Sequence, residues 1–267
     1  MGRSDRRRIA VLSDLHANGR ALSACLAQAD ADGWDDLVIA GDLLTYGPDG
    51  AATLDVVAAR VAKGAIVLSG NHDDLYVDLR NGDDRYYRSL PPWLRESVDC
   101  TRTQVDLAAL AALPWRPEYV VGPVLIAHAN PFGPRNYRYL NTDADHVEAN
   151  AALGARGMRL GVHGHTHRAK VHVQPLGFEQ PTCRRLKQSE GPGTVNAGSV
   201  GQPRSADKRA SFLMVEIDRD ELSFEHRFVD YDVAAHVAAL AALPIAQPTR
   251  DKLASFFLNA PAARQDA

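Results

Sequence analysis

Five short segments of this 267-residue chain carry histidine, aspartate or asparagine side chains that could bind a metal ion. They are Ser13-Asp14-Leu15-His16, Gly41-Asp42, Gly70-Asn71-His72-Asp73, Ala127-His128-Ala129 and Gly164-His165-Thr166-His167. Imidazole and carboxylate are ligands that Zn²⁺, Mn²⁺ and Fe²⁺ accept. Residues i and i+2 of an extended segment face the same side, so Asp14 and His16 could bind one ion together. The same spacing joins His165 and His167.

Each segment also has a plainer interpretation, because Asp-x-His and Gly-Asp pairs occur often by chance. A metal site is favoured by the joint occurrence of the five segments, each of which follows a strand-like apolar run. We interpret His163, beside the last segment, as a structural imidazole or one that supports a ligand. For the remaining histidines we expect surface or half-buried positions: His146, His172, His226 and His236.

The predicted elements explain how distant segments can meet. Short apolar runs at 9–12, 37–40 and 65–68 predict buried strands, and helically spaced apolar residues between them predict two helices. This β-α-β-α-β order is typical of parallel strands joined by crossover helices. Ligands of open α/β sheets collect beyond the carboxyl ends of the strands. We therefore expect the five segments to converge in one crevice.

The second half of the chain has a different pattern, with closely spaced strands that favour antiparallel pairing. The predicted strands are 124–127, 160–162, 171–173, 212–217 and 222–228. The predicted helices are 94–113, 143–153, which has a capping-box start at Thr142 and Asp145, and 232–243. We expect a polar loop at about 73–92, a surface loop or loosely paired hairpin at 175–193, and a frayed tail after Pro261.

Composition and charge are those of an ordinary globular chain. It is 45% hydrophobic and 24% charged, and its formal charge of −3 disfavours a long nucleic acid or an anionic membrane as partner. The three cysteines are isolated and lack CxxC spacing, which favours a reducing, cytoplasmic setting. No apolar run reaches the roughly 20 residues of a bilayer span, and the N-terminal run is too short for a signal peptide. We therefore expect a soluble protein.

The five segments together resemble those of the calcineurin-like metallophosphoesterase superfamily. Tyr46-Gly47-Pro48 and the segment from Asn196 to Arg204 extend the resemblance to its small bacterial, phosphodiesterase-like branch. The likeness covers about residues 8–243. It implies an α/β fold, a four-layer αββα sandwich of two mixed β-sheets with flanking helices. We expect one metallophosphoesterase domain over 1–267, with a core at 8–243 and a C-terminal helical tail at 244–267.

The resemblance also implies a two-metal site. One ion would be held by Asp14, His16, Asp42 and His167, and the other by Asp42, Asn71, His128 and His165, so that Asp42 is shared. His72 would approach the phosphate and protonate the leaving group without binding a metal. Ala129 stands where the family usually has glycine, and Ala197 where proline is frequent, but both changes leave the number of ligands intact.

The function expected from this resemblance is hydrolysis of a phosphodiester, of cyclic or short nucleotide type, by attack of a metal-bridging hydroxide. Two divalent ions are expected, Mn²⁺ first, with Fe, Zn or Co as alternatives. The same site would serve a phosphomonoesterase, a protein phosphatase or a dinucleoside-polyphosphate hydrolase. A binding scaffold without catalysis, like the retromer subunit of this fold, is disfavoured because no expected ligand is missing. Substrate, metal and oligomeric state stay open.

Some nearby residues have two interpretations. Arg135, Arg138 and Arg168 could contact phosphate or belong to a solvated surface. Aromatic residues could line a base-binding face, although packing is the commoner role: Tyr46, Tyr86 and Tyr87. Asp73 and Asp74 could orient His72, but we interpret them as carboxylates at the start of a helix.

Overall fold

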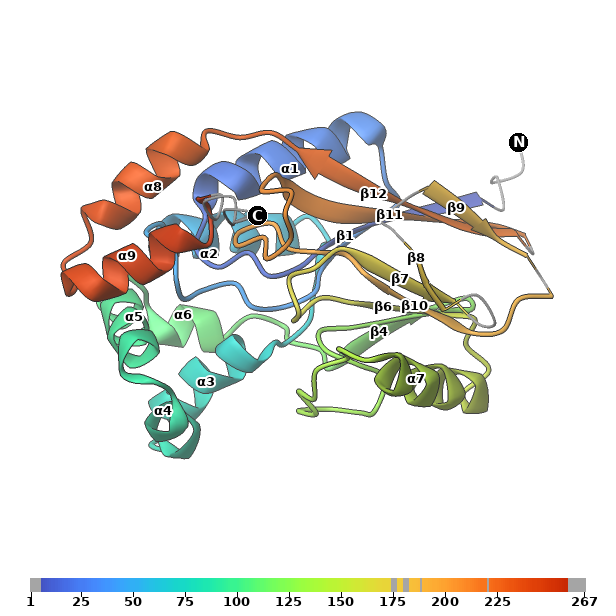
Figure 1. Ribbon diagram of the computed structural model, residues 1–267, viewed down its shortest axis with the longest axis horizontal. Helices are drawn as coiled ribbons and strands as arrows, with labels where there is room; N and C mark the ends of the chain where they lie inside the picture. The colour runs from blue at the N-terminus through green and yellow to red at the C-terminus, as the bar shows by residue number, and fades with distance from the viewer. Residues whose placement is uncertain (1–5, 174–176, 180–182, 188, 220, 259–267) are drawn as a thin grey trace, which may run out of the picture.

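The computed structural model describes residues 6–173, 177–179, 183–187, 189–219 and 221–258. Two six-stranded sheets lie face to face, with α1 outside one and α7 outside the other (Figure 1). The strand orders are β3-β2-β1-β11-β12-β9 and β4-β5-β6-β10-β7-β8. Each sheet contains parallel and antiparallel pairs. The predicted αββα fold class is therefore confirmed.

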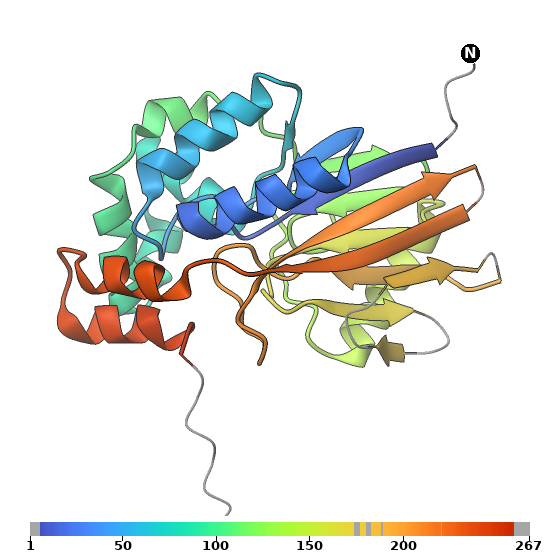
Figure 2. The ribbon, with the colours of Figure 1, turned by 90° about the horizontal axis from the view of Figure 1, so that it is seen from above.

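The first sheet begins with the predicted parallel strands β1 (Arg6–Leu12), β2 (Asp36–Ile39) and β3 (Ile66–Val67). Helices α1 (Gly19–Asp32) and α2 (Gly50–Val61) make the crossovers. Antiparallel strands complete it: β11 (Ala210–Asp218), β12 (Glu221–Val229) and β9 (Cys183–Leu186). Because β12 runs in the direction of β1, the helix that follows it lies beyond the end at which β1 finishes (Figure 2).

The second sheet contains β4 (Glu118–Val121), β5 (Val124–Ala127), β6 (Leu160–His163), β10 (Gly193–Asn196), β7 (Lys170–Val173) and β8 (Gly177–Glu179). The expectation of antiparallel pairing is wrong for β5 and β6, which are parallel. Strand β10, which the sequence analysis did not predict, is also parallel to β6. Helix α7 (Asp143–Ala155) provides the crossover from β5 to β6, and it starts with the predicted capping box of Thr142 and Asp145. This gives the second sheet carboxyl ends that face the same way.

Apolar side chains fill the space between the sheets. Along β1, Ile9 and Val11 face the second sheet, while Ala10 and Leu12 face the helices. Both sets are fully buried, as expected of a strand covered on two sides. Burying both faces fixes the register of β1, since a slip of one residue would exchange the two sets. The loop that follows Leu12 is thereby fixed in position.

The predicted helix 94–113 is two helices, α5 (Pro92–Arg102) and α6 (Leu107–Ala111). The helix is interrupted between them, and a new helix starts at Asp106, whose side chain accepts a hydrogen bond from the backbone N–H of Ala108. The loop predicted at 73–92 is also wrong, since it contains α3 (Asn71–Arg80) and α4 (Arg85–Ser89). Their polar and aromatic sequences lack the apolar period that signals a helix.

The segment predicted as a loop or hairpin at 175–193 supplies one strand to each sheet. Its strands β8 and β9 do not pair with each other, so the hairpin interpretation is wrong for the described part. Near the C-terminus, α8 (Val233–Ala241) starts after Asp232 as predicted, and α9 (Gln247–Ser255) follows. The tail after Pro261 lies outside the described residues. Among the described helices, none combines the length and the apolar character that a membrane span requires.

Candidate metal centre

Seven side chains converge where strands of both sheets end. Asp14 and His16 follow β1, and Asp42 follows β2. Asn71 is the first residue of α3, after β3. From the second sheet come His128, after β5, and His165 and His167, after β6. All seven are at most 4% exposed.

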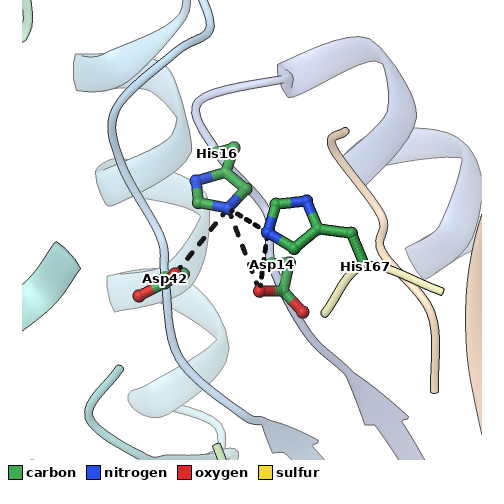
Figure 3. Close-up of side chains that lie close together, drawn as sticks. All are labelled: Asp14, His16, Asp42 and His167. Carbon is green, nitrogen blue, oxygen red and sulfur yellow. Dashed lines mark hydrogen bonds and ion pairs between the residues drawn. The ribbon is translucent and has the colours of Figure 1, made fainter. Parts of the chain in front are cut away.

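Four of these residues form a first group, shown in Figure 3. One ligand atom of each of Asp14, His16, Asp42 and His167 lies within 4.8 Å of the others. Nε2 of His16 is 3.7 Å from Oδ2 of Asp42 and 3.9 Å from Oδ1 of Asp14. Nε2 of His167 is 3.3 Å from the same Oδ1. Two imidazoles and two carboxylates thus enclose one small volume.

A second group shares Asp42 with the first. Ligand atoms of Asp42, His128 and His165 also lie within 4.8 Å of one another. Nε2 of His128 is 3.5 Å from Oδ2 of Asp42 and 3.3 Å from Oδ1 of Asn71. Asn71 therefore adds an amide oxygen to this group. The two groups meet at one carboxylate.

The imidazoles are oriented by backbone carbonyls. Nδ1 of His16, His128 and His167 lies 3.0, 2.8 and 2.8 Å from the carbonyl oxygens of Leu44, Ala40 and Gln202. A carbonyl can only accept, so each Nδ1 carries the proton and each Nε2 faces the carboxylates. Nε2 of His165 donates to the carbonyl of Tyr137 in the same way, at 2.9 Å.

The orientation of the imidazole nitrogens shows whether these residues could bind a cation. Nε2 of His16 lies 3.1 Å from Nε2 of His167, although both rings already donate through Nδ1. Two lone pairs facing each other repel, and both also face carboxylates. A cation between them would turn this repulsion into coordination, and such carbonyl-anchored imidazoles are typical of metal ligands. The donor set fits divalent metal ions.

The pKa values of the buried carboxylates also indicate negative charge at the site that lacks a compensating cation. Burial, joined by the nearby charge of Asp42, raises the pKa of Asp14 to about 7. Burial alone would also raise the pKa of Asp42, but His128 and His72 hold it well below its usual range. Burial opposes the charged form of His128, yet Asp42 raises the pKa of that imidazole to about 10. A proton on His128 therefore compensates charge where a metal ion would.

The backbone at the site is strained. Five of the seven residues have positive φ: Asp14 at 55°, His16 at 45°, Asp42 at 54°, His165 at 65° and His167 at 58°. Non-glycine residues in this region cost about 1–2 kcal/mol each, and such strain collects at functional sites. Gly41, at φ 88°, has no room for a side chain, because a Cβ would lie 2.6 Å from the nitrogen of Gly70.

Asp73 holds the loop of Asp42 in place. Its carboxylate accepts hydrogen bonds from the backbone N–H groups of Asp42, Leu43 and Gly70, at 2.7, 3.0 and 2.9 Å. Burial and the charge of Asp42 raise the pKa of Asp73 to about 7. Asp73 thus starts α3, as the sequence indicates, and also fixes the shared carboxylate. No sequence pattern indicates this second contact.

His72 lies beside both groups and belongs to neither. Its backbone N–H donates to Oδ1 of Asp42 at 2.8 Å, and its Nε2 is 3.2 Å from the hydroxyl of Tyr46. Its Nδ1 is buried and has no hydrogen-bond partner among the described residues. Burial lowers the pKa of His72, and the positive charge of Arg204 adds to that effect. His72 therefore lies at the edge of the site, in contact with Asp42 and Tyr46.

The three tyrosines named in the sequence analysis have different surroundings in the structure. Tyr46 is buried and contacts His72, so it does not form an open face for a base. The hydroxyl of Tyr87 donates to Asp99, at 2.7 Å. Tyr86 is 41% exposed, and its hydroxyl accepts from the amide of Asn71. Tyr139, which sequence reasoning missed, stacks on His165 with ring centroids 4.0 Å apart.

The three arginines named in the sequence analysis also differ in their surroundings. Arg135 pairs with Asp74 and Asp78 on α3. Arg138 pairs with Glu148 at 2.6 Å. Arg168 instead lines a pocket next to the site, together with Arg204. In the sequence, Arg204 is only the last residue of the segment that resembles the superfamily, and its neighbours carry no signal of a role.

The expectation of surface or half-buried positions for four histidines is wrong. His146, His172, His226 and His236 are 5%, 1%, 7% and 1% exposed. Helix and strand packing buries them, because each lies on the inward face of its element. His163 is buried as well, and its Nδ1 donates to the carbonyl of Ala127 at 3.2 Å. None of the five is part of either group of candidate ligands.

Several known proteins are similar to this chain over most of its length. Residues 8–220 match the model of the calcineurin-like phosphoesterase superfamily domain. A crystal structure of a metallophosphoesterase from Sphaerobacter thermophilus is 28% identical, with a TM-score of 0.73, and covers 93% of this chain and 99% of its own. A hypothetical protein from Pyrococcus horikoshii has the same fold, with 16% identity, a TM-score of 0.73, and coverage of 96% and 99%. An uncharacterized Methanocaldococcus jannaschii protein is 26% identical over 229 residues, 84% of this chain and 88% of its own.

Proposed function

This chain belongs to the calcineurin-like phosphoesterase superfamily, and on that basis we propose that it hydrolyses phosphodiesters of cyclic or short nucleotide type with two divalent metal ions. The observation that carries the proposal is the shared carboxylate of Asp42, which lies in both groups of buried candidate ligands. Two ions that share a carboxylate suit the displacement of an alkoxide from phosphorus. Phosphoester hydrolysis is also the activity that the superfamily name states.

We assign one ion to Asp14, His16, Asp42 and His167, and the other to Asp42, Asn71, His128 and His165. Imidazole, carboxylate and amide ligands favour Mn²⁺, with Fe, Zn or Co as alternatives. When bound, such ions offset phosphate charge and lower the pKa of water. The two buried carboxylates leave about two positive charges on the loaded site, which attracts a phosphate anion.

His72 is the proposed acid for the leaving group. As an acid, His72 starts as the imidazolium, with a proton on each ring nitrogen. Its Nε2–H can donate to the hydroxyl oxygen of Tyr46, 3.2 Å away. Its Nδ1, the nitrogen without a partner among the described residues, then gives its proton to the departing oxygen and leaves a neutral imidazole. Such a role contributes about 10²–10⁴ to the rate.

The test is a pair of substrates with the same chromophore. With Mn²⁺ added, the protein should hydrolyse bis-p-nitrophenyl phosphate with a higher kcat/KM than p-nitrophenyl phosphate. Faster turnover of the monoester would reassign the protein as a phosphomonoesterase. Stoichiometric binding of two ions without hydrolysis of any phosphoester would make it a binding scaffold.

We also propose a cellular location, a domain extent and a partner for the protein. The isolated cysteines favour the cytoplasm. We treat residues 1–267 as one functional domain, because α9 in the predicted tail packs against α5 and places Phe256 over the guanidinium of Arg204. A small phosphoester is the proposed partner.

A further inference from the structure

A pocket of about 240 Å³ adjoins the candidate metal centre. It is lined by Tyr139, Asn141, Thr166, Arg168 and Arg204. Thr166 lies between the candidate ligands His165 and His167 in the sequence, and the Tyr139 ring stacks on His165. The backbone N–H of Arg204 donates to the carbonyl of His167 at 3.0 Å. The pocket is therefore attached to the candidate ligands themselves.

The two arginines of this pocket keep their charge unpaired. Within the described part of the chain, no carboxylate lies within ion-pair distance of Arg168 or Arg204. Arg135 and Arg138, on the neighbouring loop, each pair with a carboxylate. The pocket is thus lined by two guanidinium groups without a counter-charge among the described residues, in a chain whose net charge is −3. Such groups favour an anionic ligand.

Arg204 is held ready for such a ligand. Its Nη2 donates to Oε1 of Gln202 at 2.9 Å, and its guanidinium lies 5.6 Å from the centre of the Phe256 ring. The Gln202 backbone carbonyl in turn accepts from His167. These contacts fix the planar fork of donors before a ligand arrives, which reduces the entropy lost on binding. Arg168 is exposed and can turn toward the same anion.

Building on the proposed phosphodiesterase function, we propose that the substrate carries a second phosphate, which Arg168 and Arg204 bind while the scissile phosphate lies at the metal centre. Guanidinium groups match the geometry of phosphate oxygens. The pocket is smaller than the roughly 300–1,000 Å³ of pockets that enclose a whole organic ligand, so it suits one phosphate group of a larger substrate. Thr166 and Asn141 offer further hydrogen bonds at its wall.

Two p-nitrophenyl diesters test this proposal, because they differ by one phosphate. Thymidine 5′-(p-nitrophenyl phosphate) has only the scissile group, and its 3′-phosphorylated form has a second. The wild-type protein with Mn²⁺ should show a higher kcat/KM for the 3′-phosphorylated form. Arg204→Ala and Arg168→Ala should each reduce that preference about 10-fold, and the double variant should abolish it.

Arg185→Ala is the matched control. Arg185 is an exposed arginine on the edge strand β9. It pairs with Ser223, which pairs with Glu216, which in turn pairs with a residue in the first half of β1. The metal centre lies beyond the other end of β1, so Arg185 is far from it. This variant should keep the wild-type preference. Arg204→Lys, which retains the charge and loses the planar fork, serves if the alanine variant does not fold. A wild type without preference, or a preference that survives in both arginine variants, would overturn the proposal.

A calorimetric titration separates this inference from the function on which it rests. Thymidine 3′,5′-bisphosphate should bind the Mn²⁺-loaded wild type at least about 10-fold more tightly than thymidine 5′-monophosphate, and Arg168→Ala should remove the difference. If neither diester is hydrolysed but this difference is present, the phosphodiesterase proposal fails and the second phosphate site stands. Equal affinities would reject the site even if both diesters are hydrolysed.

Discussion

The molecule contains two groups of buried histidines, and they differ in what surrounds them. At the metal centre, imidazoles point the nitrogen that has no carbonyl partner at two buried carboxylates. In the second group, defined here as His146, His172, Asn150, Asp143 and Thr194, each contact joins a donor to an acceptor. Asn150 donates to Nδ1 of His172, whose Nε2 donates to Asp143, and His146 bonds with Thr194 at 2.7 Å.

The backbone and the carboxylates separate the two groups further. The second group lies on regular helix and strand, whereas five of the seven candidate ligands lie in loops with positive φ. The side chain of Asp143 is 67% exposed, whereas those of Asp14 and Asp42 are at most 1% exposed. Burial of histidine alone therefore does not indicate a functional site. Buried carboxylates and a strained backbone beside the imidazoles do.

The largest difference between the groups should follow from removing a carboxylate. Asp42→Asn, which keeps the shape of the side chain, should lower kcat/KM by about 10⁴-fold, since several kcal/mol of charge stabilisation from both ions depend on it. The matched change Asp143→Asn should stay within about threefold of wild type. Steady-state hydrolysis of bis-p-nitrophenyl phosphate measures both. Similar losses in the two variants would remove the distinction.

His72→Ala should act on turnover rather than on metal content. We expect kcat to fall by about 10²-fold or more, because the leaving group loses its acid. The protein should still bind two ions, since His72 is in neither group of candidate ligands. Elemental analysis beside the kinetic assay checks both points. Loss of an ion in this variant would make His72 a ligand and contradict the assigned role.

The second group should control stability as a function of pH. Burial, joined by His172 and Lys170, lowers the pKa of His146 from 6.5 to about 4. Between pH 6.5 and about pH 4, the unfolded chain binds a proton at His146 that the folded chain does not bind. The free energy of unfolding therefore falls as the pH drops from 6.5 toward 4. Below pH 4 both states bind this proton, and His146 causes no further loss of stability. Allowing for solvent screening, the loss is about 1–2 kcal/mol.

Urea unfolding of wild type and His146→Gln across this pH range measures the effect. The variant should lose less stability than wild type between pH 6.5 and pH 4, while its activity at neutral pH stays within about threefold. Parallel curves for the two proteins would show that His146 does not titrate as described. A large loss of activity would place the second group in the function.

The smallest effect should come from Tyr46→Phe, which removes the hydroxyl beside Nε2 of His72. Loss of one hydrogen bond of about 1 kcal/mol predicts a decrease of about fivefold in kcat. KM and metal content should stay as in wild type. Tyr87→Phe, which removes a hydroxyl that donates to Asp99, is the control and should leave kcat unchanged. An unchanged kcat in Tyr46→Phe would mean that this hydroxyl does not position His72.

The sequence was most informative where local signals and tertiary position agree. The apolar runs ending at Leu12 and Ala40 predicted parallel strands, and the polar residues after them could be placed at one edge. The superfamily membership rests on those same segments and is confirmed. Their distances and the carbonyl contacts of the imidazoles come only from packing of the two sheets.

Other features had an incomplete local signal or none. Asp73 indicated the start of α3, but the contacts of its carboxylate with the loop of Asp42 are tertiary. Tyr139 reaches the site from an irregular loop without periodicity. The burial of His146 and His172 depends on α7 packing over the second sheet. Sequence patterns report the period of an element, but they do not report which face a distant segment covers.

Anomalous diffraction from crystals grown with Mn²⁺ tests the central claim most directly. The account predicts two peaks on either side of the Asp42 carboxylate, one among Asp14, His16 and His167, the other among Asn71, His128 and His165. The pair His146 and His172 should show none. An absence of peaks at Asp42, or a peak between His146 and His172 instead, would contradict the account.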